Sequence, residues 1–206
     1  MLPLPHVEFH FDFGSPNCYL ARTVLEGIEQ RTSAQVAYVP VLLGGIFKLT
    51  NNQSPATAFA AVPSKMAYNR LETSRFIRRH GLERFRPNPH FPVNTVLIMR
   101  VAVAAELDGQ LHPVMDAVFR AMWEDGFKMD HPAVVRTALD AAGLDGARLL
   151  ACTQDPTIKD RLIQNTQRSV DRGVFGAPTF FLGEDMFFGK DRLHDVEDAI
   201  MKRQTA

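Results

Sequence analysis

The chain has 206 residues, of which 46% are hydrophobic, and 23 Lys or Arg residues balance 23 Asp or Glu residues. This balance, without long basic runs, argues against nucleic acid or an anionic membrane as a partner. No apolar run approaches the roughly 20 residues of a membrane-spanning helix, and the first residues lack the pattern of a secretory signal. Cys18 and Cys152 lie too far apart in sequence for a metal or redox motif, so the sequence predicts a cytoplasmic protein with reduced thiols.

The first predicted element is a strand that leads through a turn into a helix. Apolar and polar residues alternate from Val7 to Phe13, as in a strand. Gly14 permits a sharp turn, and Ser15 followed by Pro16 is typical of a helix N-cap and first helical position. A helix N-terminus presents unpaired N–H groups and the positive end of the helix dipole, which suits an anion.

The spacing from Ser15 to Cys18 also matches a thioredoxin-type Cys-x-x-Cys site in which oxygen replaces the first sulfur. Such a site cannot form its own disulfide, but its hydroxyl can donate a hydrogen bond to the thiolate of another molecule. On this stretch alone, a plain helix cap at Ser15 and a small core residue at Cys18 explain the pattern equally well.

The rest of the chain predicts a second strand, a long helical block and a terminal hairpin. The second strand is expected at Gln35–Val39, and the pattern from Ile46 to Arg172 is helical without a convincing strand. Strands at Thr179–Leu182 and Met186–Phe188 flank a Gly183–Asp185 turn. The helices are expected at 46–49, 65–79, 95–107, 113–124, 132–142 and from Asp155-Pro156 onward, with a last helix capped by Asp191 and carrying Met201 inward.

The predicted order is therefore β-α-β, a helical block, then β-β-α. Without the block this is the order of a thioredoxin sheet, so we expect an α/β, thioredoxin-like fold with a large all-helical insertion. Residues 1–43 and 173–206 would form the thioredoxin-like domain, and residues 44–172 the helical insertion domain. Pro178 then lies where that fold places a cis-proline beside the active-site helix.

Four segments give the chain a more specific resemblance: Phe11–Ala21, Phe91–Thr95, Phe119–Gly126 and Gly173–Leu193. They resemble 2-hydroxychromene-2-carboxylate isomerases and their relatives, the kappa-class glutathione transferases, which have thioredoxin folds similar to the DsbA disulfide oxidoreductases. The resemblance implies a homodimeric, glutathione-dependent isomerase of aromatic compound catabolism, in which glutathione thiolate adds reversibly to an unsaturated carbonyl substrate. The alternatives are a kappa-type transferase or peroxidase, a DsbA-like thiol oxidoreductase that uses Cys18, and a glutathione-binding protein without turnover.

By the same resemblance, Ser15 is the catalytic residue and contacts the glutathione sulfur. The backbone of Ala177, just before Pro178, would pair with the cysteinyl main chain of glutathione. Asp191 and Arg192 would hold the γ-glutamyl end. The remaining candidates are Asn52 and Lys65 for glutathione, and Lys48 and His90 for the substrate.

Other residues have simpler interpretations. Lys190 replaces a small polar residue that is usual in the family, and either adds a cation for a carboxylate or points to solvent. Trp123 and its helical neighbours Phe119 and Met122 are expected in the core. The scattered histidines predict no metal site, and the turn at Ser15 lacks the second glycine of a serine hydrolase nucleophile elbow.

Overall fold

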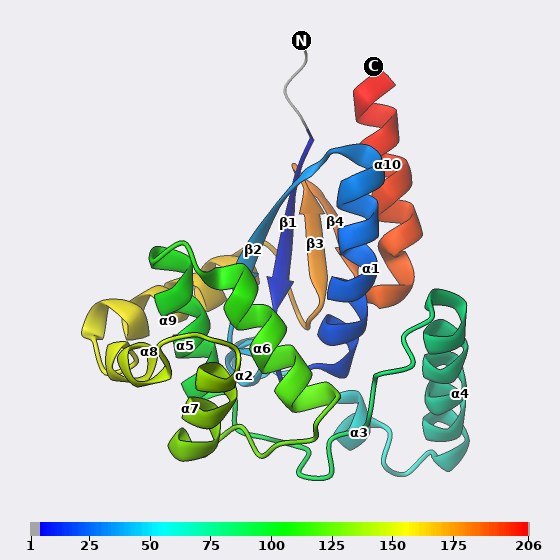
Figure 1. Cartoon of the computed structure of the whole chain (residues 1–206). Helices are drawn as coiled ribbons and strands as arrows, with labels where there is room; N and C mark the ends of the chain where they lie inside the picture. The colour runs from blue at the N-terminus through cyan, green and yellow to red at the C-terminus, as the bar shows by residue number, and fades with distance from the viewer. Residues whose placement is uncertain (1–4, 206) are drawn as a thin grey trace.

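One mixed sheet organises the computed structural model, which describes residues 5–205. Its strands are β1 (His6–Phe11), β2 (Gln35–Pro40), β3 (Thr179–Leu182) and β4 (Asp185–Phe188). They lie in the order β2-β1-β3-β4 (Figure 1). β1 pairs in parallel with β2 and antiparallel with β3, and β3 pairs antiparallel with β4. The predicted thioredoxin-like order of the sheet is therefore confirmed.

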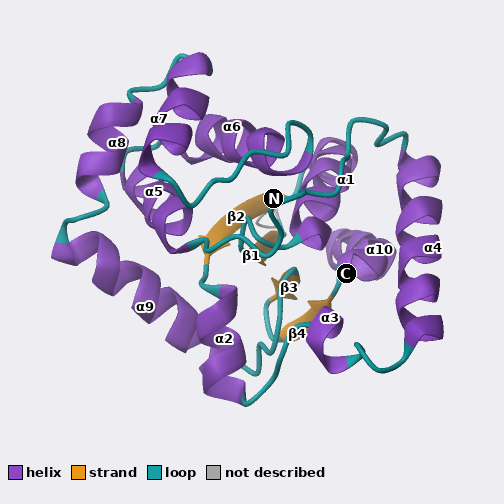
Figure 2. Cartoon of the chain, turned by 90° about the horizontal axis from the view of Figure 1, so that it is seen from below, coloured by secondary structure: helices purple, strands orange, loops and turns teal. Residues whose placement is uncertain are grey.

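Helices surround this sheet, and most belong to the block between β2 and β3 (Figures 1 and 2). The helices are α1 (Pro16–Thr32), α2 (Leu43–Thr50), α3 (Pro55–Ala58), α4 (Pro63–His80), α5 (Val96–Leu107), α6 (Leu111–Trp123), α7 (Pro132–Ala141), α8 (Gly146–Cys152), α9 (Pro156–Asp171), the 3-10 helix η1 (Lys190–Arg192) and α10 (Leu193–Thr205). α1 packs against α10, which contacts β3, whereas α5 and α9 contact β2. Among residues 5–205, no helix is both long and apolar enough to cross a bilayer.

A cluster of aromatic rings fills the core at the end of β1. The rings of Phe9 and Phe180 stack at 5.0 Å between centroids, and Phe11 meets Phe13 at 5.3 Å. Phe13 in turn packs edge-on against Phe119 of α6 at 4.7 Å. The sheet and the helical block therefore share buried residues, which fixes the turn after β1 against α6. The division into residues 1–43 with 173–206 and residues 44–172 stays a prediction.

Several element boundaries differ from the prediction. α2 and α4 begin earlier than expected, at Leu43 and Pro63. The short helices α3 and α8 were not predicted, although each has a side-chain N-cap: Ser54 accepts from the Thr57 N–H and Asp145 from the Arg148 N–H. Such caps also occur in turns, so they do not by themselves identify a helix.

Three further expectations are wrong near the C-terminus. Asp185 belongs to β4, which leaves only Gly183 and Glu184 in the hairpin turn. Asp191 lies inside η1, whose N-cap is Gly189 with φ 97°. Glycine tolerates that backbone conformation, so the chain turns before Asp191 and not at it. Met201, expected inward, is 48% exposed on α10.

Candidate active site

Ser15 lies at the junction of β1 and α1 and joins two distant parts of the chain. Its side-chain oxygen accepts a hydrogen bond from the Cys18 N–H at 3.3 Å, which caps α1 as predicted. Its hydroxyl donates to the carbonyl oxygen of Ala177 at 3.0 Å. The Ala177-Pro178 peptide is cis, as the thioredoxin-like order predicted. Ser15 is only 4% exposed, so its hydroxyl lies in a largely dry position at a helix N-terminus.

The buried Asp12 side chain holds the turn between β1 and α1 in place by hydrogen bonds, a role that the sequence did not predict. Its carboxyl group is fully buried and accepts hydrogen bonds from the Gly14 N–H at 2.8 Å, the Leu43 N–H at 2.7 Å and the Thr95 hydroxyl at 3.1 Å. Burial raises the pKa of Asp12, although the three donors oppose this. One side chain thus ties the Ser15 turn to the start of α2 and the start of α5. The sequence signal that could have indicated this role is the position of a charged residue between two phenylalanines, Phe11 and Phe13.

Close packing explains the glycine and the tryptophan beside this turn. A Cβ atom on Gly14 would lie 2.8 Å from the Thr95 methyl group, so any side chain at this position would force Thr95 to shift. The Trp123 indole N–H donates to the Phe13 carbonyl oxygen at 2.8 Å. Trp123, Phe119 and Met122 are all buried, which confirms their expected place in the core.

Cys18 lacks the exposure and the low pKa of a reactive thiol. It is fully buried and forms no disulfide. Burial raises its pKa to about 12, and hydrogen bonds from the neighbouring turn oppose the shift only in part. The thiolate is the reactive form of cysteine. At neutral pH Cys18 is therefore a neutral core residue.

The segment after β4 returns to the cis-proline. The Gly189 N–H donates to the Pro178 carbonyl oxygen at 2.9 Å, and η1 packs against α1. Lys190 is buried and its ammonium donates to Asp191 Oδ1 at 2.6 Å, so the interpretation that Lys190 points to solvent is wrong. Arg192 is exposed and pairs with Asp195 at 3.4 Å.

The other candidates differ in their contacts and exposure. Asn52 donates from Nδ2 to the Phe175 carbonyl oxygen at 2.9 Å, which places it beside the segment that leads to Ala177. Lys65 is exposed on α4 with its ammonium 4.2 Å from the centre of the Phe59 ring. Lys48 on α2 and His90 in the loop before α5 are also exposed. Within residues 5–205, no hydrogen bond or ion pair joins Lys65, Lys48 or His90 to Ser15.

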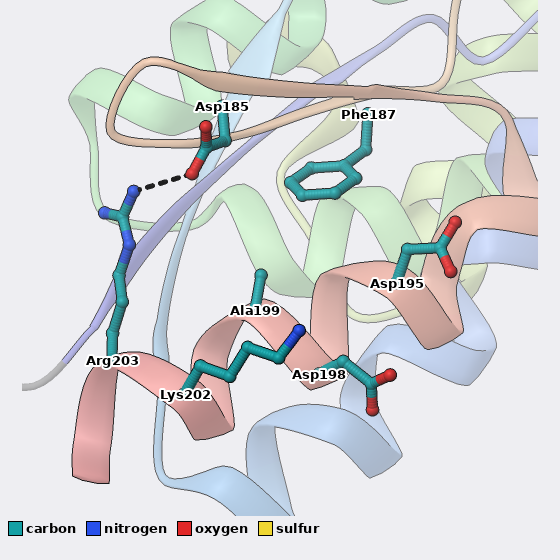
Figure 3. Close-up of a pocket in the computed structure, with 7 residues that line it drawn as sticks. All are labelled: Asp185, Phe187, Asp195, Asp198, Ala199, Lys202 and Arg203. Carbon is teal, nitrogen blue, oxygen red and sulfur yellow. Dashed lines mark hydrogen bonds and ion pairs between the residues drawn. The ribbon is translucent and has the colours of Figure 1, made fainter. Parts of the chain in front are cut away.

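Two open hollows lie elsewhere on the molecule. One, of about 480 Å³, lies between β4 and α10. Figure 3 shows Phe187 of β4 facing Ala199 of α10, and the pair formed by Asp185 and Arg203 at 3.0 Å. The other, of about 630 Å³, is lined by α1, α6 and α7. Neither is lined by Ser15 or Ala177, so neither is part of the candidate site. In the part of the chain that the structure describes, no three His, Cys, Asp or Glu side chains converge on a metal position.

Comparison with known proteins places the chain in a family. The chain is 28% identical over 196 residues to a 2-hydroxychromene-2-carboxylate isomerase of Pseudomonas sp. (strain C18), covering 94% of this chain and 89% of that protein. It is 26% identical over 218 residues to glutathione S-transferase kappa 1 of Caenorhabditis elegans, covering 99% and 94%. A solved 2-hydroxychromene-2-carboxylate isomerase superposes with a TM-score of 0.80 at 27% identity, covering 97% and 96%. The family model of the DSBA-like thioredoxin domain matches residues 6–201, and the chain therefore belongs to the DSBA-like thioredoxin family and is related to isomerases and glutathione transferases.

Proposed function

We propose that this protein is a glutathione-dependent isomerase that acts on small aromatic unsaturated carbonyl compounds of the 2-hydroxychromene-2-carboxylate type. The observation that carries the proposal is the position of the Ser15 hydroxyl, which caps α1 and touches Ala177 next to a cis-proline. A redox enzyme of this fold needs a reactive thiol there, whereas a hydroxyl suits the thiolate of a bound cofactor. The isomerases among the relatives support the substrate class.

The proposed role of Ser15 is energetically reasonable. A free thiol has a pKa of about 8.5, and lowering it by ~2 units needs ~2.7 kcal/mol of preference for the anion. A helix dipole supplies about 0.3–1 kcal/mol, and a hydrogen bond to a charged group about 1.5–3 kcal/mol. Together these terms suffice. Ser15 would therefore donate to the sulfur and is not itself the nucleophile.

The bond from Ser15 to Ala177 also suggests how glutathione would enter. The hydroxyl must turn from the Ala177 carbonyl oxygen to the sulfur, at a cost of about 1 kcal/mol for the broken hydrogen bond. An extended cysteinyl backbone can return an N–H donor to that same carbonyl oxygen, as an added strand does. Binding of the peptide would thus free the hydroxyl for the sulfur.

The reaction proceeds in three steps under this proposal. Before these steps the hemiketal ring of the substrate opens: the ring C–O bond breaks, the proton of the hemiketal hydroxyl passes to the phenolic oxygen, and an unsaturated ketone is exposed. The glutathione thiolate then attacks the electrophilic carbon of that ketone, a C–S bond forms, and the displaced electron pair moves to the carbonyl oxygen as an enolate. The former double bond is now single and rotates. The enolate then collapses, the double bond re-forms, and the thiolate leaves. Glutathione is regenerated, so it acts as a cofactor and is not consumed.

The remaining assignments are part of the same proposal. Asp191 and Arg192 would bind the γ-glutamyl end, since their helix begins next to Gly189, whose N–H donates to the Pro178 carbonyl oxygen. Asn52 and Lys65 would contact the rest of glutathione, and Lys48 and His90 the substrate. We also propose, from the family resemblance alone, a cytoplasmic homodimer that works in aromatic compound catabolism.

A kappa-type glutathione transferase is the second candidate, because a relative with that name matches 99% of the chain. Its reaction would begin with the same activated thiolate and end in a stable conjugate. A DsbA-like oxidoreductase is less well supported, since Cys18 is fully buried and its pKa is raised to about 12. The peroxidase alternative needs the same thiolate as the transferase.

Product analysis tests the proposal directly. The protein is incubated with 2-hydroxychromene-2-carboxylate, with and without glutathione, and both products and free thiol are measured. We expect isomerisation only when glutathione is present and full recovery of the glutathione. Equal isomerisation without glutathione contradicts the proposal. Loss of free thiol into a conjugate, with this substrate or with chlorinated aromatics, favours the transferase.

A further inference from the structure

Lys190 is a buried cation beside the proposed thiol site. Its side chain is only 5% exposed, and its ammonium donates to Asp191 Oδ1 at 2.6 Å. The ammonium also lies over the ring of Phe76 on α4, with 4.9 Å from Nζ to the ring centre. A lysine is rarely buried unless it is paired, because removing its charge from water is costly. The Lys190 ammonium thus has two partners, Asp191 and Phe76.

Asp191 shows the opposite exposure. Its side chain is 67% exposed, so the carboxylate faces outward from η1 while one of its oxygens is already bonded to Lys190. The Lys190 ammonium occupies the same kind of position that the ammonium of a bound ligand would take. A carboxylate with a resident counter-ion attracts a second ammonium less strongly, since the pair carries no net charge.

The Lys190 ammonium also has hydrogen-bond donors beyond the one that Asp191 accepts. An ammonium group carries three N–H donors, and within residues 5–205 one hydrogen bond, to Asp191, is observed for it. An anionic oxygen of a ligand that lies against Asp191 can therefore be attracted by the lysine. The Lys190 ammonium therefore attracts the carboxylate of such a ligand, whereas the neutralised Asp191 attracts the ligand's ammonium only weakly.

We propose that Lys190 determines which thiols this protein accepts: by neutralising Asp191, it makes the site indifferent to a free ammonium and opens it to cysteinyl thiols that carry a carboxylate without one. This inference rests on the proposed function, in which Asp191 faces the γ-glutamyl end of glutathione. It adds a class of thiol cofactor and the residue responsible for it.

A comparison of two thiols tests the inference. Glutaryl-cysteinylglycine is glutathione with the ammonium replaced by hydrogen, so it keeps the size and the cysteinyl core. Calorimetric titration gives the dissociation constant of each thiol with the full-length protein. For the unaltered protein we expect the two constants to agree within about threefold. In Lys190→Met, which keeps an unbranched apolar side chain against Phe76, we expect glutathione to be preferred by about tenfold.

The matched control is Lys202→Met, which removes an exposed lysine from α10 without touching Asp191. We expect this variant to behave like the unaltered protein. A tenfold preference for glutathione in the unaltered protein, about 1.4 kcal/mol, overturns the inference even if Lys190→Met does not fold. An unchanged ratio in a folded Lys190→Met also overturns it. If neither thiol binds at millimolar concentration, the proposed glutathione dependence fails as well. If both thiols bind but the ratio of their dissociation constants is the same in Lys190→Met, only the inference about Lys190 fails.

Discussion

The Ser15 hydroxyl donates a hydrogen bond of 3.0 Å to the carbonyl oxygen of Ala177, 162 residues further along the chain. The same side chain accepts the Cys18 N–H and so begins α1. One buried serine therefore closes the first turn and fastens it to the segment before β3. The candidate site is built around this contact, and its stability and its proposed chemistry depend on the same oxygen atom.

Replacing Ser15 with alanine removes both hydrogen bonds at once. We expect the free energy of unfolding of Ser15→Ala to fall by about 1–2 kcal/mol, because a buried cap and a buried acceptor lose their partner. Urea denaturation followed by circular dichroism measures this. Ser54→Ala is the control: Ser54 caps the short, exposed α3, and its loss should cost about 0.5 kcal/mol. Equal stability of Ser15→Ala and the unaltered protein would show that the contact contributes nothing to the fold.

Asp12→Asn tests the anchor beneath the turn. An amide has one acceptor oxygen, so its NH₂ group must face at least one of the donors that Asp12 now accepts, and we expect a loss of about 1–3 kcal/mol. The loss should depend on pH. Burial raises the pKa of Asp12 in the folded state, so its favourable contribution is complete below the unfolded pKa of about 3.9 and is lost as the pH rises through the folded value.

The measurement for Asp12 is urea unfolding of both proteins at pH 5 and pH 8. The unaltered protein should gain stability relative to Asp12→Asn as the pH falls. Thr95→Val is the matched control, because it removes one of the three donors and leaves the carboxyl group in place. A difference between Asp12→Asn and the unaltered protein that is the same at both pH values contradicts the raised pKa.

His10 should produce a pH dependence of the opposite sign. It is buried, with its ring nitrogens bonded to Ser169 at 2.8 Å and Glu8 at 3.1 Å. Burial lowers the pKa of His10, although Glu8 opposes this and Arg172 and Arg168 reinforce it. Its contribution to stability is therefore present above the unfolded pKa of about 6.5 and is lost as the pH falls toward the folded value.

Thermal unfolding from pH 8 to pH 5 tests the expectation for His10. The melting temperature of the unaltered protein should fall further over this range than that of His10→Gln. The control is His194→Gln, because His194 is 82% exposed and pairs with Asp198 at the surface. If His10→Gln and His194→Gln show the same pH profile, His10 does not titrate as its burial implies.

The two cysteines offer an internal comparison of reactivity. Cys18 is fully buried, with a pKa raised to about 12, whereas Cys152 is partly exposed at the end of α8. A bulky thiol reagent should therefore modify Cys152 in the native protein long before Cys18. Peptide mapping by mass spectrometry distinguishes the two sites. Rapid modification of Cys18, together with disulfide reductase activity, would favour the oxidoreductase alternative.

The parts of the fold that the sequence predicted well have strong local signals. β3 runs from Thr179 to Leu182 as expected, because Pro178 and Gly183 mark its ends. Long periodic helices such as α5 and α6 were also placed to within about two residues. α3 and α8 were missed because a helix of a few residues gains little from its own hydrogen bonds and depends on tertiary packing.

The candidate site shows a similar division. Ser15 and Pro178 could be identified from local motifs and the order of elements. The contacts of Asp12 could not, because Leu43 and Thr95 lie 31 and 83 positions away in sequence. The same holds for Lys190, whose burial depends on Phe76 from a separate helix. Local sequence patterns predict the helix, strand or turn on which a residue lies. The residues that bury its side chain are distant in sequence and are brought to it by the tertiary fold.

The ultraviolet absorbance of the bound thiolate, titrated against pH, tests the central claim most directly. With the unaltered protein, glutathione should ionise about 2 units below the free thiol pKa of about 8.5. With Ser15→Ala the curve should move at least about 1 unit back toward the free value, while the affinity for glutathione changes by less than about tenfold. If the two proteins give the same titration curve, Ser15 does not stabilise the thiolate and the proposed mechanism is wrong.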